Sequence, residues 1–118
     1  MKKHFYVIGG TMGAGKTTVC NILKKKLKNS VFLDGDWCWD MEPFWVTEET
    51  KAMVMDNITY VLNNFLACSA YDHVIFCWVL HEQEILDTLL SRLDCRNAEV
   101  HLYSLILDEK SLEERLKK

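Results

Sequence analysis

Short apolar runs and longer segments of helical periodicity alternate along this chain. Four runs rich in β-branched and aromatic residues predict strands at residues 5–8, 31–33, 74–80 and 100–107. The run at 74–80 is apolar at every position, which is typical of a central strand covered on both faces.

Apolar residues at helical spacing fill the gaps between these strands. The stripe after the first strand consists of Val19, Ile22, Leu23 and Leu27. Thr47 is the expected N-cap of a helix through about Leu66, whose stripe consists of Met55, Ile58, Val61, Leu62 and Phe65. The third stripe consists of Ile85, Leu86, Leu89, Leu90 and Leu93. A last helix is expected to begin at Asp108 or Ser111.

This alternation predicts a doubly wound α/β fold, a three-layer α/β/α sandwich around a mainly parallel sheet. Right-handed crossovers place helices on both faces and bring the carboxyl ends of the strands to one edge, where such folds bind ligands. The chain has 118 residues, 49% of them hydrophobic, which is enough core for one domain at residues 1–118 and not for two.

Charge and cysteine content narrow the class of protein. A net charge of −3 argues against a nucleic-acid partner held by phosphate contacts. No apolar run approaches membrane-spanning length, and the first strand begins too early for a signal peptide, so we expect a cytoplasmic protein without a membrane partner. The five cysteines are scattered and odd in number, which favours reduced thiols over a disulfide framework or a cysteine zinc site.

The first strand leads into the phosphate-binding motif G-x-x-x-x-G-K-S/T. Its residues are Gly10, Thr11, Met12, Gly13, Ala14, Gly15, Lys16 and Thr17, and Thr18 adjoins them as a further expected nucleotide contact. In such a loop the backbone N–H groups surround the β-phosphate, the lysine reaches the β- and γ-phosphates, and the threonine hydroxyl coordinates Mg²⁺. A turn that only joins a strand to a helix has no use for Lys-Thr there, so we expect a bound nucleotide.

Two carboxylates follow the second strand, in the turn Asp34-Gly35-Asp36. Phosphoryl transfer uses one carboxylate to orient Mg²⁺, and a kinase often uses another to accept the proton of the attacking hydroxyl. We assign Asp36 as general base or acceptor ligand and Asp34 as support for Mg²⁺ or its waters, while the reverse assignment stays open. Asp-Gly is also an ordinary turn sequence, so this interpretation depends on the loop upstream.

The loop at residues 10–17 and the sequence LDGD at residues 33–36 together resemble the small P-loop kinases that phosphorylate metabolites. These include gluconate kinase, adenylylsulfate kinase and chloramphenicol phosphotransferase. The resemblance implies transfer of the γ-phosphate of ATP, with Mg²⁺, to a small acceptor that meets Asp36. It also implies an arginine-bearing lid and a fifth strand after residues 111–118, so we expect the sequence to lack its lid and last strand. A fragment, a partner that supplies these groups and a binder without efficient chemistry stay open.

Other residues near the strand ends are candidates for acceptor contacts. Trp37 and Trp39 would form an apolar wall with indole N–H donors, and packing at the sheet edge or in a dimer contact is the alternative. His81 and Glu82 follow the third strand, where many ATPases and GTPases have an aspartate for the metal. For this pair, a polar helix start is the alternative.

Two functions fit these residues. The first is an ATP- and Mg²⁺-dependent kinase for a small-molecule alcohol, in which Lys16 and Asp36 are catalytic. The alternative is a nucleotide-binding module without acceptor chemistry, which the missing lid favours and the acidic turn opposes. An open sheet edge after the fourth strand would allow pairing with a second copy of the chain.

Overall fold

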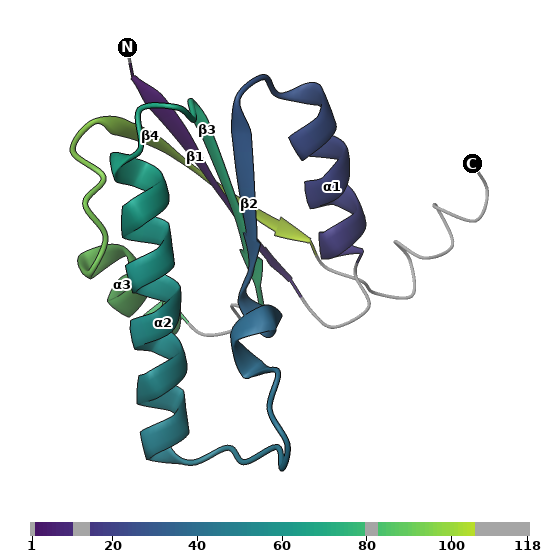
Figure 1. Ribbon diagram of the computed structural model, residues 1–118, viewed down its shortest axis with the longest axis vertical. Helices are drawn as coiled ribbons and strands as arrows, with labels where there is room; N and C mark the ends of the chain where they lie inside the picture. The colour runs from purple at the N-terminus through teal and green to yellow at the C-terminus, as the bar shows by residue number, and fades with distance from the viewer. Residues whose placement is uncertain (1, 11–14, 80–82, 106–118) are drawn as a thin grey trace.

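The computed structural model of the chain describes residues 2–10, 15–79 and 83–105 (Figure 1). Its elements, in chain order, are β1 (Lys3–Gly10), α1 (Lys16–Lys26), β2 (Ser30–Asp34), the 3₁₀ helix η1 (Gly35–Trp39), α2 (Glu48–Ala67), β3 (His73–Trp78), α3 (Gln83–Ser91) and β4 (Ala98–Leu105). The four predicted strands and the first three predicted helices are confirmed. The predicted last helix, with its caps Asp108 or Ser111, lies outside the described residues.

The strands form one parallel sheet in the order β2-β3-β1-β4. The chain therefore crosses β3 on its way from β1 to β2, and crosses β1 on its way from β3 to β4. Helix α1 lies on one face of the sheet, and α2 and α3 lie on the other (Figure 1). This arrangement confirms the three-layer α/β/α sandwich. Among the described residues, no helix is both long and apolar enough to cross a bilayer.

Two apolar layers, one on each face, hold the sheet to its helices. The larger layer joins the sheet to α2 and α3, and its buried residues are Phe5, Val7, Leu33, Val54, Ile58, Leu62, Leu66, Val74, Phe76, Leu89 and Leu93. The smaller layer lies under α1, and its buried residues are Ile8, Cys20, Phe32, Ile75 and Cys77. Side chains alternate between the faces of a strand, so β1 and β3 contribute to both layers.

The buried stripes of two helices differ from the predicted ones. In α1, Ile22 is 48% exposed and Cys20 is fully buried in its place. In α2 the buried apolar residues are Val54, Ile58, Leu62 and Leu66, whereas the predicted Met55, Val61 and Phe65 are only partly buried. Residues at a constant spacing of four form one ridge along a helix, and in α2 this ridge faces the sheet.

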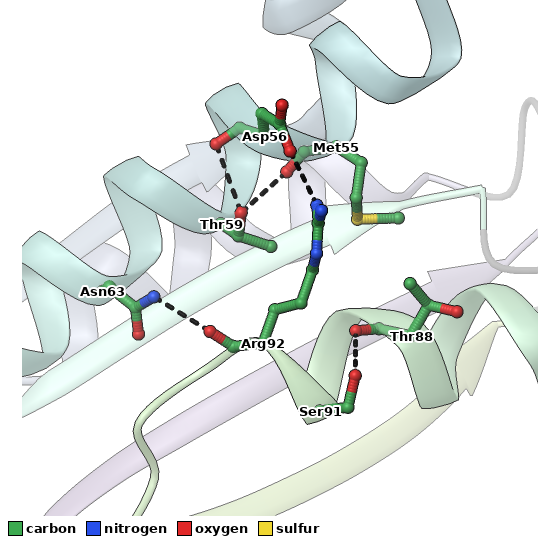
Figure 2. A network of polar contacts seen from close by, with 7 residues as sticks. All are labelled: Met55, Asp56, Thr59, Asn63, Thr88, Ser91 and Arg92. Carbon is green, nitrogen blue, oxygen red and sulfur yellow. Dashed lines mark hydrogen bonds and ion pairs between the residues drawn. The ribbon is translucent and has the colours of Figure 1, made fainter. Parts of the chain in front are cut away.

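A polar network joins α2 to the end of α3 (Figure 2). The Arg92 guanidinium donates to Asp56 Oδ1 at 2.9 Å, and Asn63 Nδ2 donates to the Arg92 carbonyl oxygen at 3.0 Å. Asn63 Oδ1 in turn accepts from the Asp94 backbone N–H at 2.9 Å. The backbone that leaves α3 is therefore tied to α2 by one side-chain amide, which sets where the chain enters β4.

Candidate nucleotide site

The phosphate-binding motif lies where β1 ends and α1 begins. Gly10 is the last residue of β1, and Gly15 precedes the helix with a φ of +85°, in the left-handed region that favours glycine. Helix α1 then begins at Lys16, so its N-terminal N–H groups lie at the carboxyl edge of the sheet. The predicted contacts Thr11, Met12, Gly13 and Ala14 lie outside the described residues.

One buried carboxylate connects this helix to the acidic turn. Asp34, at the end of β2, is 6% exposed. Its Oδ2 accepts a hydrogen bond from the Thr17 hydroxyl at 2.9 Å, and its Oδ1 accepts one from the Asp36 backbone N–H at 2.9 Å. The structure thus brings together two motifs that are 17 residues apart in the sequence. Because Asp34 caps η1 with the same carboxylate, it also fixes the direction in which the chain leaves β2.

The glycine between the two aspartates is required by a neighbour on β3. A Cβ atom added to the buried Gly35 would lie 2.5 Å from Cγ and from Cδ1 of the Trp78 indole. Real carbon atoms do not approach so closely, so only a glycine lets the turn pass over this ring. Trp78 is therefore a packing residue that shapes the acidic turn.

Asp36 and Lys16 differ in burial but are electrostatically linked. Lys16 is 9% exposed, whereas Asp36 is exposed at the rim of the site. Partial burial raises the pKa of Asp36 above its usual range, the charge of Asp34 raises it further, and the charge of Lys16 opposes both. A carboxylate with a raised pKa is a better proton acceptor than an ordinary aspartate, which suits a general base.

Two buried cysteines lie close to Asp34. Cys20, in the second turn of α1, and Cys77, beside Asp34 in the sheet register, are both fully buried. A hydrogen bond with Cys20 and burial raise the pKa of Cys77 far above its usual range, so this thiol stays neutral. All five cysteines are free, as the sequence predicted. Cys20 and Cys77 act here as small apolar residues.

The predicted acceptor contacts are in different environments. Trp37 is 56% exposed, with its ring edge-on to Phe32 at a centroid distance of 5.2 Å. Trp39 packs partly buried against the larger apolar layer and lies 5.7 Å from the Phe44 ring. Trp37 is thus available to a ligand, whereas Trp39 supports the fold. His81 and Glu82 lie outside the described residues, and Thr18 is exposed on α1.

The arginines of the described chain lie far from the phosphate-binding loop. Arg92 pairs with Asp56, and Arg96 pairs with Asp94. Both line a hollow of about 1130 Å³ beside Lys3 and Ala98, at the opposite ends of β1 and β4 from the loop. Their cationic groups are already compensated there. Within residues 2–10, 15–79 and 83–105, therefore, no arginine is placed to contact a phosphate at the loop.

The donor atoms at the loop fit a small hard cation. The Thr17 hydroxyl donates its proton to Asp34, which leaves its oxygen lone pairs available to a metal. Mg²⁺ prefers oxygen ligands and keeps several of its waters, so a carboxylate directly behind the hydroxyl is well placed to accept from those waters. Thr17 would therefore hold the ion, and Asp34 would orient it.

Sequence reasoning located these residues but missed their contacts. The motif and the turn were both predicted, yet the bond between Thr17 and Asp34 and the contact of Trp78 with Gly35 were not. The one available signal was the position of each residue at a strand end, because parallel strands bring such ends to one edge.

Comparison with solved structures supports the same fold. A chain of the Pnkp1/Rnl/Hen1 RNA repair complex is 14% identical with a TM-score of 0.75, and the match covers 98% of this chain and 37% of that one. A gluconokinase from Sinorhizobium meliloti is 18% identical with a TM-score of 0.64, at coverages of 96% and 63%. The APS kinase of Mycobacterium tuberculosis is 15% identical with a TM-score of 0.64, at coverages of 98% and 93%.

These likenesses show the fold, and the chain spans well under half of the RNA repair protein that it matches. No curated protein sequence matches the chain. A family model described as an AAA domain matches residues 7–118, which include the phosphate-binding motif, the acidic turn, the second half of β1 and the whole of β2, β3 and β4. On this match, the chain belongs to the AAA-domain family of P-loop proteins.

Proposed function

We propose that this chain is an ATP- and Mg²⁺-dependent kinase that transfers the γ-phosphate of ATP to a hydroxyl group of a small molecule. The observation that carries the proposal is the hydrogen bond between Thr17 and the buried Asp34. It joins the start of the nucleotide-binding helix to the turn that bears Asp36. A phosphate donor and a proton acceptor therefore share one edge of the sheet.

The nucleotide is held by charge and by backbone dipoles. Lys16 lies at the start of α1, where the helix N-terminus attracts anions. Its ammonium group neutralises negative charge on the β- and γ-phosphates, and Mg²⁺ at Thr17 supplies further positive charge when bound. We assign Lys16 and the backbone of residues 10–18 to nucleotide binding.

Asp36 receives the proton of the acceptor. The hydroxyl oxygen forms a bond to the γ-phosphorus while the bond between that phosphorus and the β,γ-bridging oxygen breaks, and ADP leaves. The hydroxyl proton moves to the Asp36 carboxylate. The exposure of Asp36 lets an acceptor reach it from solvent, and its raised pKa strengthens it as a base.

The surroundings of Asp36 favour an acceptor that is neutral and has a flat or apolar face. Two carboxylates lie close together here, and they repel an anionic acceptor. The exposed Trp37 ring adjoins them and would stack on a sugar, a nucleoside or an aromatic alcohol. A structural neighbour described as a sugar kinase is consistent with a sugar acceptor.

The second candidate function is a nucleotide-binding module without acceptor chemistry. The observation that favours it is the pairing of Arg92 and Arg96 with carboxylates at the other end of the sheet. An arginine on the transferring phosphoryl group contributes about 10³ to 10⁵ in rate, and no described arginine is positioned for this task.

The test measures ADP release from Mg·ATP with and without sugars, nucleosides, aminocyclitols, aromatic alcohols and an oligonucleotide with a free 5′-hydroxyl. The variants are Lys16→Ala, which should lose nucleotide binding, and Asp36→Asn, which should keep it. Asp40→Asn is the matched control, because Asp40 is exposed four residues away and the substitution is chemically the same.

A kinase should show acceptor-stimulated ADP release that Asp36→Asn lowers by about 10²- to 10⁴-fold and Asp40→Asn leaves unchanged. Nucleotide binding without stimulation by any acceptor would support the second candidate. Stimulation by the oligonucleotide alone would replace the small-molecule acceptor with a polynucleotide. Equal effects of the two aspartate substitutions would remove Asp36 from the mechanism.

A further inference from the structure

A cluster of imidazoles and one carboxylate lies on the α1 face of the sheet, at the start of the strands. His4 on β1, and Glu99 and His101 on β4, project from the same face, because His4 pairs with Glu99 and Tyr6 pairs with His101 in the register. Helix α1 covers the part of this face made by β2, β3 and Ile8. None of the buried residues of the smaller apolar layer, which lies under α1, comes from β4. The His4 and Glu99 side chains are accordingly 36% and 52% exposed.

The three side chains present their ligand atoms to one point. His4 Nδ1 lies 3.1 Å from His101 Nε2 and 3.5 Å from Glu99 Oε2, and all three atoms lie within 4.8 Å of one another. In a tetrahedral zinc site with metal–ligand bonds of about 2.0–2.1 Å, neighbouring ligand atoms are about 3.3–3.4 Å apart. Two of the three separations already match this value, and a small rotation of the exposed Glu99 side chain adjusts the third.

The rings are held in place before any ion binds. His4 stacks on His73 at a centroid distance of 5.6 Å and on His101 at 5.3 Å, and the His101 ring stacks on Tyr6 at 4.9 Å. The backbones beneath belong to paired strands and cannot separate. Ligands on rigid elements with packed rings lose little freedom on binding a metal.

We propose that His4, Glu99 and His101 form a Zn²⁺ site that fastens the edge strand β4 to β1. Two imidazole nitrogens and one carboxylate oxygen suit Zn²⁺, and the fourth position faces solvent, where a water completes the tetrahedron. The cysteine pattern predicted the absence of a cysteine zinc site, and this cluster contains no cysteine.

This site is separate from the nucleotide site. His4 is six residues before Gly10 on the same strand, a distance of about 20 Å at the rise of a β-strand. An ion at this point does not reach the phosphates, so its role is structural. The proposal therefore does not depend on the proposed kinase activity.

Without a metal, the same atoms already form a hydrogen bond and an ion pair. This arrangement is the competing explanation for the cluster, because cross-strand polar pairs are common in sheets. The two explanations differ in measurable ways, since a metal site binds one ion per chain and needs all three side chains.

The experiment titrates the metal-free full chain, in the absence of nucleotide, with Co²⁺ and then displaces it with Zn²⁺. Tetrahedral Co²⁺ with nitrogen and oxygen ligands gives visible absorption bands without the near-ultraviolet thiolate band that a cysteine site gives. The variants are His101→Gln and Glu99→Gln. His73→Gln is the matched control, because His73 stacks on His4 while its own Nδ1 contacts the Lys28 carbonyl oxygen.

We expect one ion per chain and a rise in melting temperature of roughly 10 °C when Zn²⁺ is at a hundred times its Kd. Each ligand variant should weaken binding at least about tenfold, since even outer-shell partners contribute that much, and His73→Gln should change it little. If His101→Gln does not fold, the metal affinity of Glu99→Gln tests the proposal, because the Glu99 side chain is exposed. Absence of one-to-one binding, a thiolate band, or an affinity in both ligand variants equal to that of the parent chain would overturn the proposal.

Discussion

Replacing Gly35 with alanine tests whether β3 dictates the shape of the acidic turn. The new Cβ would lie 2.5 Å from Cγ and Cδ1 of Trp78 and 3.0 Å from its Cβ. Rotating the indole relieves the first two contacts, but the third involves an atom fixed by the β3 backbone. Either the turn or the strand must therefore shift.

The cost follows from the size of this overlap. Insertion of a methyl group into a packed site that cannot fully relax costs about 1–3 kcal/mol. The unfolding entropy of about 2.1 cal/mol/K per residue is about 0.25 kcal/mol/K for the whole chain, so the melting temperature should fall by roughly 4–12 °C.

Thermal unfolding by circular dichroism measures this change, with Trp78→Ala as a second background. In that background the ring is absent and only the 3.0 Å contact with the Cβ of residue 78 remains, so Gly35→Ala should cost clearly less than in the parent chain. Gly15→Ala is the control, because Gly15 has a φ of +85° and no atom within 4 Å of an added Cβ. Its cost of about 1–2 kcal/mol comes from the backbone alone and should be the same in both backgrounds.

Two results would refute the reasoning. A melting temperature of Gly35→Ala equal to that of the parent chain would mean that the turn relaxes without cost. An equal cost with and without the indole would mean that Trp78 is not the obstacle, and the glycine would then need another explanation.

Three further predictions concern charge, the helix junction and a helix cap. Because its pKa is raised in the folded chain, the folded state favours the protonated Asp36 carboxyl, and stability falls as pH rises from the unfolded pKa through the folded one. The ionised carboxylate therefore opposes folding at pH 7, and Asp36→Asn should raise stability there while lowering turnover. In the pH profile of kcat/KM, the midpoint of the acid limb should lie at a higher pH than an ordinary aspartate would give. Asn63→Ala removes two hydrogen bonds and should cost about 1–3 kcal/mol in urea unfolding, whereas Asp56→Asn at the exposed Arg92 pair should cost at most about 1 kcal/mol. Thr47→Ala removes a capping box and should cost about 0.5–2 kcal/mol by the same assay, and no loss would mean that the cap is not formed in solution.

The order of strands and helices and the chemistry of the loop were determined by the sequence alone. Apolar periodicity is a local property, and it located β1, β2, β3 and β4 within a few residues of their observed bounds. The Thr47 cap was predicted for the same reason, since its hydroxyl bonds only to residues of its own helix. The phosphate-binding motif is also a local pattern.

The pairings across the sheet were decided only by the tertiary structure. The order β2-β3-β1-β4 brings Thr17 to Asp34, Trp78 to Gly35, and His4 to Glu99 and His101. Each of these contacts depends on which strands are neighbours and in what register. A sequence of alternating elements permits several strand orders, and a register shift of one residue would turn each side chain to the opposite face.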